Sequence, residues 1–265
     1  MAMNYEYIKY KIDQNVGILI LYRPDVLNSF NRPMAKETQD VLEKCRDDEN
    51  VRAILITGEG RGFSAGQDLA EAIPPDGSPA PEISDIVRES YSPIVKLIRT
   101  IEKPVVAGVN GVAAGAGANI ALACDFVIAS ENASFIQAFC KIGLIPDSGG
   151  TFYLPRLVGL PRATAMMMLG EKVSAPDALQ IGMIYKVYPE DSFQDELMKF
   201  VRHLAKQATK ALGITKRALN QSFENDLETQ LKVEEQLQKE AGQSQDYHEG
   251  VKAFLEKRKP NFHGK

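Results

Sequence analysis

The chain has 265 residues, a length that suits one large domain or a domain with a small appendage, and 44% of its residues are hydrophobic, which is enough for a sizeable core. Its net charge of −4 and sequence pI near 5.6 argue against nucleic acid as a partner, because nucleic-acid binding needs a concentrated basic surface. Three cysteines without a CxxC spacing and three scattered histidines argue against a disulfide framework and against a metal site.

The N-terminal segment carries Glu6, Lys9 and Lys11 and has no apolar stretch of the kind that a signal peptide needs. Together with the odd number of cysteines, this predicts a cytoplasmic protein. Residues 5–13 and 17–23 are strand-like segments separated by a short polar turn, which predicts a β-hairpin.

The next elements alternate between helix and strand. Residues 33–48 predict an amphipathic helix that begins at Pro33, where the missing N–H costs nothing. Residues 51–58 predict a buried strand. The proline-rich stretch 72–85 predicts an irregular, mobile surface loop, and residues 85–101 predict the next helix.

Residues 62–66, Gly-Phe-Ser-Ala-Gly, match the G-x-S-x-G motif of serine hydrolases. That motif needs a strand that runs directly into the turn, whereas the strand here is predicted to end near Gly58. A catalytic triad would also need a histidine, and all three histidines lie in the C-terminal part of the chain. A hydrolase with Ser64 as its nucleophile is therefore a remote alternative.

Residues 104–129 are nearly uncharged and contain a GxxxG pattern, as some membrane-spanning helices do. However, Asn110, Asn119, Asp125 and several glycines interrupt this run. It therefore predicts a strand, a tight turn, a buried helix over 116–123 and a second strand, and no membrane association.

From about residue 190 onward the pattern is helical only, which predicts a core over 1–190 and a helical C-terminal region over 191–265. The repeated strand–strand–helix units of the first part predict an α/β core built from similar stacked turns. The helices expected in the second part are 192–207, 210–221, 226–241 and 246–257.

Two segments share a feature that points to catalysis. FSAGQDL (63–69) and NGVAAGAGANIALACD (110–125) each place small residues where a strand gives way to a helix. Backbone N–H groups at a helix start are unpaired, and glycine and alanine allow a ligand oxygen to approach them closely. Two such groups that converge on one point would form an oxyanion hole.

These two segments, followed by ASFIQAFCKIGLIPDSGGTFYLPRLVG and the ending GVKAFLEKRKPNF, closely resemble the signature blocks of the crotonase (enoyl-CoA hydratase/isomerase) superfamily. The resemblance covers about residues 5 to 263. It implies an α/β fold, the crotonase (ClpP-like) ββα superhelix with a C-terminal helical trimerisation region. It also implies an acyl-CoA thioester as substrate, no cofactor beyond the coenzyme A of that substrate, and a homotrimer or a dimer of trimers.

The resemblance assigns roles to particular residues. The oxyanion hole would consist of the backbone amides of Gln67 and Ala116, which would stabilise an enolate formed from the thioester. The residues implied in binding coenzyme A or the acyl group are Leu27, Ala65, Asp68, Leu69, Gly115, Phe139, Phe254 and Lys257.

The chain departs from the hydratase pattern at two positions, because Asn119 and Phe139 stand where hydratases carry their catalytic glutamates. The remaining candidate acid–base group is Asp147, which alone would be interpreted as a helix N-cap. With it, the chain resembles the branch of the superfamily that isomerises ring-1,2-epoxyphenylacetyl-CoA. The sequence therefore predicts a CoA-thioester isomerase in which Asp147 carries a proton, and burial among Phe139, Ile142, Leu144 and Ile145 is expected to raise the pKa of Asp147.

Three other activities stay open as alternatives. An enoyl-CoA hydratase would have to work without either glutamate. A dehalogenase of this superfamily would bring a tryptophan and an active-site histidine, and the chain has no tryptophan and no histidine before His203. A non-catalytic RNA-binding relative conflicts with the acidic balance of the chain.

Overall fold

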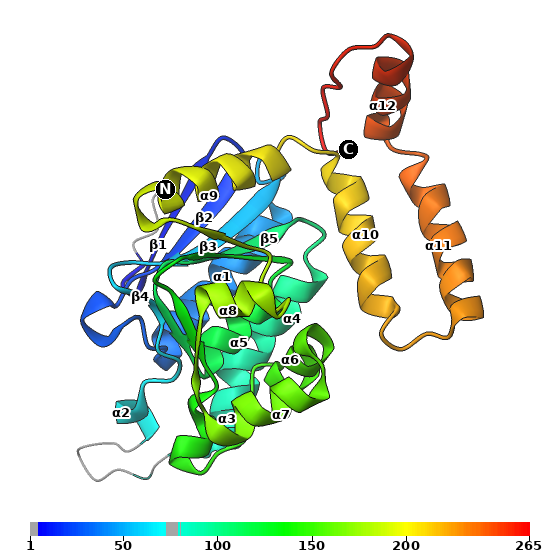
Figure 1. The fold of residues 1–265 in the computed structure, drawn as a ribbon. Helices are drawn as coiled ribbons and strands as arrows, with labels where there is room; N and C mark the ends of the chain where they lie inside the picture. Colours follow the sequence, from blue (N-terminus) through cyan, green and yellow to red (C-terminus); the bar gives the residue numbers. More distant parts are fainter. Residues whose placement is uncertain (1–4, 73–78, 80) are drawn as a thin grey trace.

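The computed structural model describes residues 5–72, 79 and 81–265, so part of the proline-rich stretch 72–85 lies outside the described residues. Two sheets organise the core (Figure 1). The first sheet has six strands, in the order β1 (Ile8–Asp13), β2 (Val16–Leu21), β3 (Ala53–Gly58), β5 (Val105–Val109), β7 (Phe126–Ser130) and β10 (Lys186–Tyr188). The second has four short strands, β4 (Gly62–Ser64), β6 (Val112–Ala114), β8 (Ser134–Ile136) and β9 (Lys172–Ser174).

The strands of the two sheets alternate along the chain. β3, β5 and β7 pair in parallel in the first sheet, and each is followed within four residues by β4, β6 or β8 of the second. Helices then return the chain to the first sheet. This is the stacked strand–strand–helix arrangement that the sequence predicts, and the hairpin of β1 and β2 is also confirmed.

Helices cover both faces of the six-stranded sheet, which explains why β3 and β5 are buried throughout. On one face, α1 (Arg32–Asp47) and α5 (Ala116–Ala123) contribute to the larger apolar cluster. On the other face, α9 (Glu190–Leu204) packs Phe193 and Leu197 onto β2, β3 and β5. α8 (Ala175–Gln180) lies between β9 and β10 in the chain. Within the described residues, no helix is long and apolar enough to cross a membrane.

The helix predicted over 85–101 begins earlier and is interrupted. It consists of α3 (Ile83–Ile86), a π-helical turn η2 (Val87–Tyr91) and α4 (Ser92–Thr100). Pro93 has no N–H to donate to the carbonyl of Glu89, four residues earlier. The Gln39 side chain supplies the missing donor, since its Nε2 lies 2.8 Å from the Glu89 oxygen and 3.0 Å from the Ser90 oxygen. A proline and a polar side chain from α1 therefore explain the irregular turn.

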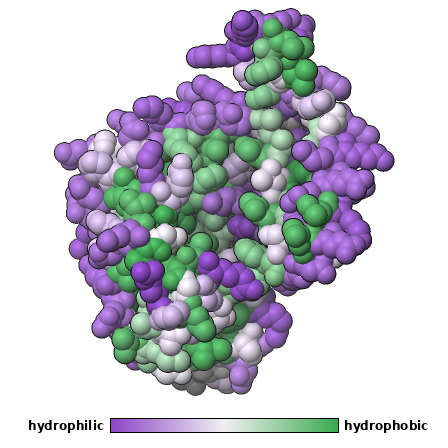
Figure 2. Space-filling model, turned by 45° about the vertical axis from the view of Figure 1, so that its right-hand side comes forward, coloured by the Kyte–Doolittle hydropathy of each residue, from purple (hydrophilic) through white to green (hydrophobic). Residues whose placement is uncertain are grey.

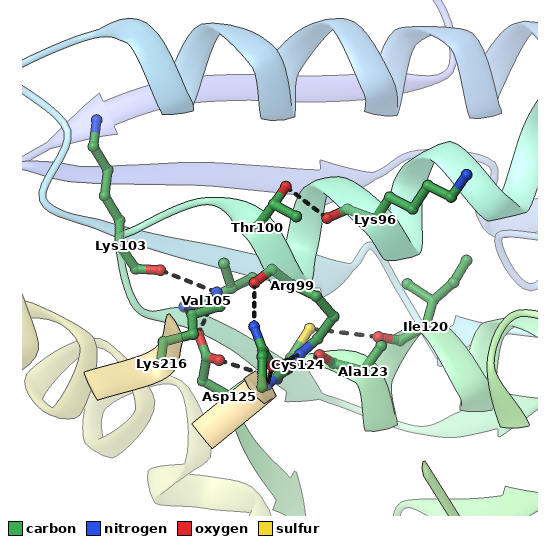
Figure 3. Close-up of polar contacts among 11 residues, drawn as sticks. Lys96, Arg99, Thr100, Lys103, Val105, Ile120, Ala123, Cys124, Asp125 and Lys216 are labelled. Carbon is green, nitrogen blue, oxygen red and sulfur yellow. Dashed lines mark hydrogen bonds and ion pairs between the residues drawn. The ribbon is translucent and has the colours of Figure 1, made fainter. Parts of the chain in front are cut away.

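A buried ionic cluster attaches the C-terminal helices to the core (Figure 3). Asp125, at the start of β7, accepts hydrogen bonds from Lys216 Nζ at 2.8 Å, from Arg99 Nη1 at 3.1 Å and from the Val105 amide at 2.8 Å. Lys216 belongs to α10 (Thr209–Gln221) and is only 6% exposed. This single carboxylate therefore connects α4, β5 and α10.

α10, α11 (Leu227–Ala241) and α12 (Gln245–Leu255) project away from the sheets (Figure 1). The tail after α12 returns to the core at Arg52, which donates to the Phe262 carbonyl at 2.7 Å and to Thr209 Oγ1 at 3.0 Å. Figure 2 shows hydrophobic residues exposed on these helices as well as on the core. α10 is thus fastened to the core by the ionic cluster and at Arg52, and α11 and α12 form a projecting arm beyond it.

Candidate active site

The first of the two glycine turns follows β4. Here the Phe30 amide donates to the Gly66 carbonyl at 2.6 Å, and the Asp68 amide donates to the Phe30 carbonyl at 2.9 Å. This parallel bridge uses the groups on either side of Gln67, so the N–H of Gln67 itself points away from Phe30. In the described part of the chain, that amide has no acceptor.

The second turn lies between β6 and α5. Its geometry is fixed by the Gly115 amide, which donates to the Ile136 carbonyl at 2.9 Å. Ala116 is the first residue of α5, so its N–H has no partner within the helix. The aligned peptide dipoles of α5 add positive potential at this N–H. An anionic oxygen is the ligand that such a position favours.

The two turns are in direct contact. A Cβ atom placed on Gly66 would lie 2.7 Å from the Ala114 carbonyl oxygen and 3.3 Å from the Ala116 nitrogen, and Gly66 has a φ of +89°. A Cβ atom on Gly117 would lie 2.6 Å from the Ser64 carbonyl oxygen. Only glycine therefore lets the segments that carry the Gln67 and Ala116 amides approach one another.

Asp147 is held in a loop between the short helix η3 (Ala138–Ile142) and α6 (Gly150–Val158). Its carboxylate oxygen Oδ1 accepts a hydrogen bond from Ser148 Oγ at 2.7 Å. Its backbone carbonyl accepts from the Gly150 amide at 2.8 Å and from Asn119 Nδ2 at 2.9 Å. The N-cap of α6 is Gly149, so the interpretation of Asp147 as a helix cap is wrong, and its side chain is left for another use.

Burial raises the pKa of the Asp147 carboxyl group, and the hydrogen bond from Ser148 offsets part of this effect. Both the direction and its cause, burial, agree with the sequence-based expectation, but most of the neighbours expected to provide the burial are themselves exposed. Ile142 and Ile145 are 52% and 81% exposed in the chain, and of the four apolar residues named for this role only Phe139 is buried.

The sequence-based prediction missed Tyr91, a buried residue on which the Asp147 charge acts. It lies at the end of the π-helical turn, is 1% exposed and packs edge-on against Phe30 with ring centroids 6.1 Å apart. Burial raises the pKa of Tyr91, and the negative charges of Asp147, Glu71 and Asp68 raise it further. Tyr91 is therefore a neutral hydroxyl in the field of these carboxylates, and its only signal in the sequence is the Pro93 that distorts its helix.

A pocket of about 510 Å³ adjoins Asp147. It lies between the helical segment 83–96 and the loop 144–147, and its wall is largely apolar. Arg88 and Lys96 are the cationic residues in the lining. The residues that line it are Ile83, Ser84, Val87, Arg88, Ser92, Pro93, Lys96, Leu144, Ile145, Pro146 and Asp147.

Several of the predicted ligand-contact residues surround the two turns. The Ala65 amide donates to the Leu27 carbonyl at 2.9 Å, which places Leu27 beside the first turn. Phe139 lies against the second turn, with its ring atom Cζ 3.8 Å from the Cβ position of Gly115.

The other two contact residues follow the first turn. Asp68 forms an ion pair with Arg23 at 2.8 Å. Leu69 begins the short helix α2 (Leu69–Ala72) and is 51% exposed. Its side chain is thus open to solvent at the edge of the site.

Phe254 and Lys257 lie elsewhere in the chain. Phe254 is 83% exposed on α12, in the projecting arm, far from α2 in Figure 1. The tail after α12 is fastened at Arg52, next to the start of β3, whereas the first turn follows β4, beyond the opposite end of β3. A single chain does not bring these two residues to its own glycine turns.

The hydrolase alternative conflicts with the position of Ser64. Its side chain is fully buried, and its hydroxyl donates to the Asn28 carbonyl at 2.8 Å. The same oxygen accepts a hydrogen bond from the Gly66 amide at 3.2 Å. Ser64 therefore stabilises the first turn and is not presented to a substrate.

Known proteins resemble this chain over nearly its whole length. Residues 11–265 match the family model described as enoyl-CoA hydratase/isomerase. The chain is 45% identical to 1,2-epoxyphenylacetyl-CoA isomerase of Escherichia coli (strain K12), over 98% of this chain and 99% of that protein. It is 42% identical to a protein of Rhodobacter capsulatus named "Probable enoyl-CoA hydratase", over 99% of this chain and 100% of the relative. The crystal structure of an enoyl-CoA hydratase from Bacillus anthracis superposes with a TM-score of 0.89 at 31% identity, over 98% of this chain and 100% of that one.

Proposed function

The chain belongs to the enoyl-CoA hydratase/isomerase family, and we propose that within this family it is an isomerase that acts on a CoA thioester and moves a proton with Asp147. The preferred substrates are 1,2-epoxyphenylacetyl-CoA and 3-enoyl-CoA thioesters. The observation that carries this proposal is the combination of hydrogen-bond donors and acidic groups in the site. It has two unpaired amides on touching turns and one half-buried carboxylate, with an amide and a phenyl ring at positions 119 and 139.

The first step uses the backbone. The thioester carbonyl oxygen accepts hydrogen bonds from the amides of Gln67 and Ala116. These bonds strengthen as negative charge develops on that oxygen, so they lower the energy of the enolate more than that of the bound thioester. The Ala116 amide has the additional support of the α5 dipole.

The second step uses the carboxylate. With a 3-enoyl-CoA as substrate, Asp147 takes a proton from the carbon next to the thioester, and the electron pair of that C–H bond passes into the enolate. The protonated Asp147 then returns the proton to a carbon farther along the conjugated system, while the electrons of the enolate form the new double bond. Burial helps this cycle, because a raised pKa makes the carboxylate a stronger base.

Water addition is less suited to this site. A hydratase must hold a water molecule with one group and protonate carbon with another, whereas Asn119 is already bonded to the Asp147 carbonyl and to Gln137 Nε2. Phe139 offers no proton at all. The relatives named hydratases nevertheless make hydration the outcome to test against.

The binding of coenzyme A is proposed to involve the first turn and the segment Ala65 to Leu69. Phe254 and Lys257 are proposed to contact the nucleotide end of coenzyme A that is bound to a neighbouring chain, because the arm that carries them projects from its own core. We propose that the chain assembles into a homotrimer or a dimer of trimers, in which each arm reaches the site of a neighbour.

The experiment is a comparison of the unmodified protein with Asp147→Asn on a panel of 3-enoyl-CoA, 2-enoyl-CoA and epoxyphenylacetyl-CoA substrates, with products identified by mass and absorbance. We expect isomerised products from the unmodified protein, and a loss of about 10²–10⁴-fold in kcat for the variant with little change in affinity for coenzyme A. A hydrated product as the main outcome, or an amide variant with full activity, would contradict the proposal.

Stability provides the control for that variant. The raised pKa means that the charged carboxyl group is less favourable in the folded chain than in the unfolded one. Above this pKa, Asp147→Asn is therefore expected to unfold at the same or a higher temperature than the unmodified protein, and the difference should shrink as pH falls through the Asp147 pKa. If Asp147→Asn loses activity but not stability, the loss is due to the missing carboxylate and not to unfolding.

A further inference from the structure

Asn119 links the two halves of the candidate site. It lies in α5, three residues after Ala116, which corresponds to a rise of about 4.5 Å along the helix axis. Its Nδ2 donates to the Asp147 backbone carbonyl at 2.9 Å. α5 thus carries the Ala116 amide at its start and, one turn later, the Asn119 side chain that is hydrogen-bonded to the loop of Asp147.

The orientation of the Asn119 amide is fixed from the other side. Gln137 Nε2 donates to Asn119 Oδ1 at 2.8 Å, so Nδ2 is the end that faces Asp147. Both side chains are 1% exposed, which excludes water as a competing partner. A buried amide with a bonded acceptor end and a bonded donor end has one orientation, because any rotation leaves a buried polar group unpaired.

The space around this amide is equally restricted. A Cβ atom on Gly150 would lie 2.3 Å from Asn119 Nδ2, and the Gly150 amide donates to the same Asp147 carbonyl at 2.8 Å. The Asp147 carbonyl therefore receives two hydrogen bonds, one from its own loop and one from α5. The loop bond joins the Asp147 carbonyl to α6, whereas the Asn119 bond joins it directly to the helix that carries the Ala116 amide.

We propose that Asn119 is a positioning residue, which sets the location of the Asp147 carboxylate relative to the Ala116 amide through the chain Gln137–Asn119–Asp147. It does not touch the substrate. Proton transfer between carbon and a carboxylate needs a near-attack distance, and a displacement of about 1 Å costs on the order of 10²-fold in rate. Loss of the hydrogen bond between Asn119 and the Asp147 carbonyl should therefore lower kcat. This inference rests on the proposed role of Asp147.

The test is a double-mutant cycle on kcat for the isomerisation of a 3-enoyl-CoA, with Asn119→Ala, Asp147→Asn and the combined variant. If Asn119 acts through Asp147, the single Asn119→Ala change lowers kcat on the order of 10–10²-fold with KM nearly unchanged. The same change has no further effect in the Asp147→Asn background, where only the oxyanion hole supplies the residual rate.

Each failure has its own signature. If Asn119→Ala lowers the residual rate of Asp147→Asn by the same factor as in the unmodified protein, Asn119 supports the oxyanion hole or the fold in general, and the inference is overturned. If Asp147→Asn is itself fully active, the proposed function fails before the cycle is interpreted. An unchanged kcat in Asn119→Ala overturns the inference alone.

Two further variants keep the test independent of folding. Asn119→Leu keeps nearly the same side-chain volume and removes the Nδ2 donor without adding a charge or a new donor, so it should repeat the non-additive loss if the alanine variant does not fold. Asn220→Ala is the matched control, because Asn220 Nδ2 also donates to a backbone carbonyl, that of Arg99, at 2.9 Å. It lies on α10 outside the site, and its kcat should stay within a factor of about two of the unmodified value.

Discussion

At the scale of single residues, Asp147 and Ser148 form a hydrogen-bonded pair. Burial raises the pKa of the Asp147 carboxyl group, and the Ser148 hydroxyl lowers it by donating to the charged form. These opposing effects decide the pH below which the carboxylate is protonated and cannot act as a base. The rate of isomerisation should therefore fall on the acid side as pH drops through the Asp147 pKa.

Ser148→Ala removes the hydrogen bond that favours the charged form, so the pKa of Asp147 should rise further. We expect the acid limb of kcat/KM to move to higher pH, with the rate on the alkaline plateau retained. The measurement is a pH–rate profile on one substrate. A limb that stays in place or moves to lower pH would show that Asp147 is not the titrating base.

Ser148→Gly is the paired control. Ser148 has a φ of +52°, in the left-handed region, so glycine removes the same hydroxyl and relieves the backbone as well. Both variants should shift the acid limb alike. A shift seen only with glycine would trace the effect to the backbone.

Residue patterns predicted some parts of the site and not others. The two amide turns could be predicted, because glycine and alanine at a strand–helix junction leave the backbone amides there open to a ligand. Tyr91 could not, since its burial depends on how Pro93 and the distant Gln39 distort one helix. The hydrogen bond from Asn119 to Asp147 could not be predicted either, because it joins residues 28 positions apart and depends on how the side chain is oriented.

At the scale of elements, the order of helices and strands was predictable because each stacked turn repeats the same pattern. The strands of the second sheet were not predicted individually. β4, β6 and β8 have three residues each, too few for any periodicity to appear. What defines them is parallel pairing with one another, which is a tertiary contact.

The attachment of α10 gives a prediction at this scale. Asp125 neutralises the buried Lys216, whose pKa is lowered by burial and raised again by the Asp125 charge. Asp125→Ala leaves an uncompensated buried cation and an unpaired Val105 amide, and it should reduce the free energy of unfolding by about 3–5 kcal/mol in urea titrations.

Lys216→Met is the matched variant for this cluster. It removes the buried charge and leaves Asp125 with its Arg99 partner at 3.1 Å, so it should cost clearly less than Asp125→Ala. Equal losses from the two changes would mean that the cluster acts by packing, with no specific role for the carboxylate.

At the scale of the whole molecule, the projecting arm leaves large apolar side chains in water. Phe254, Leu255 and Leu227 are 83%, 74% and 76% exposed on α11 and α12. We expect sedimentation equilibrium to give a mass of three or six copies of the 29.2 kDa chain. A monomer that is fully active would contradict the proposal that Phe254 and Lys257 serve the site of a neighbouring chain.

In the proposed complex, one thioester oxygen binds the amides of both glycine turns, and Asp147 lies on the other side of the acyl group. The most direct measurement is a crystal structure with an unreactive acyl-CoA thioester bound. We predict that its carbonyl oxygen lies about 2.7–3.1 Å from both the Gln67 and the Ala116 nitrogens, with the Asp147 carboxylate facing the adjacent carbon. A carbonyl oxygen bound by only one of these amides, or a carboxylate turned away from the acyl group, would contradict the account.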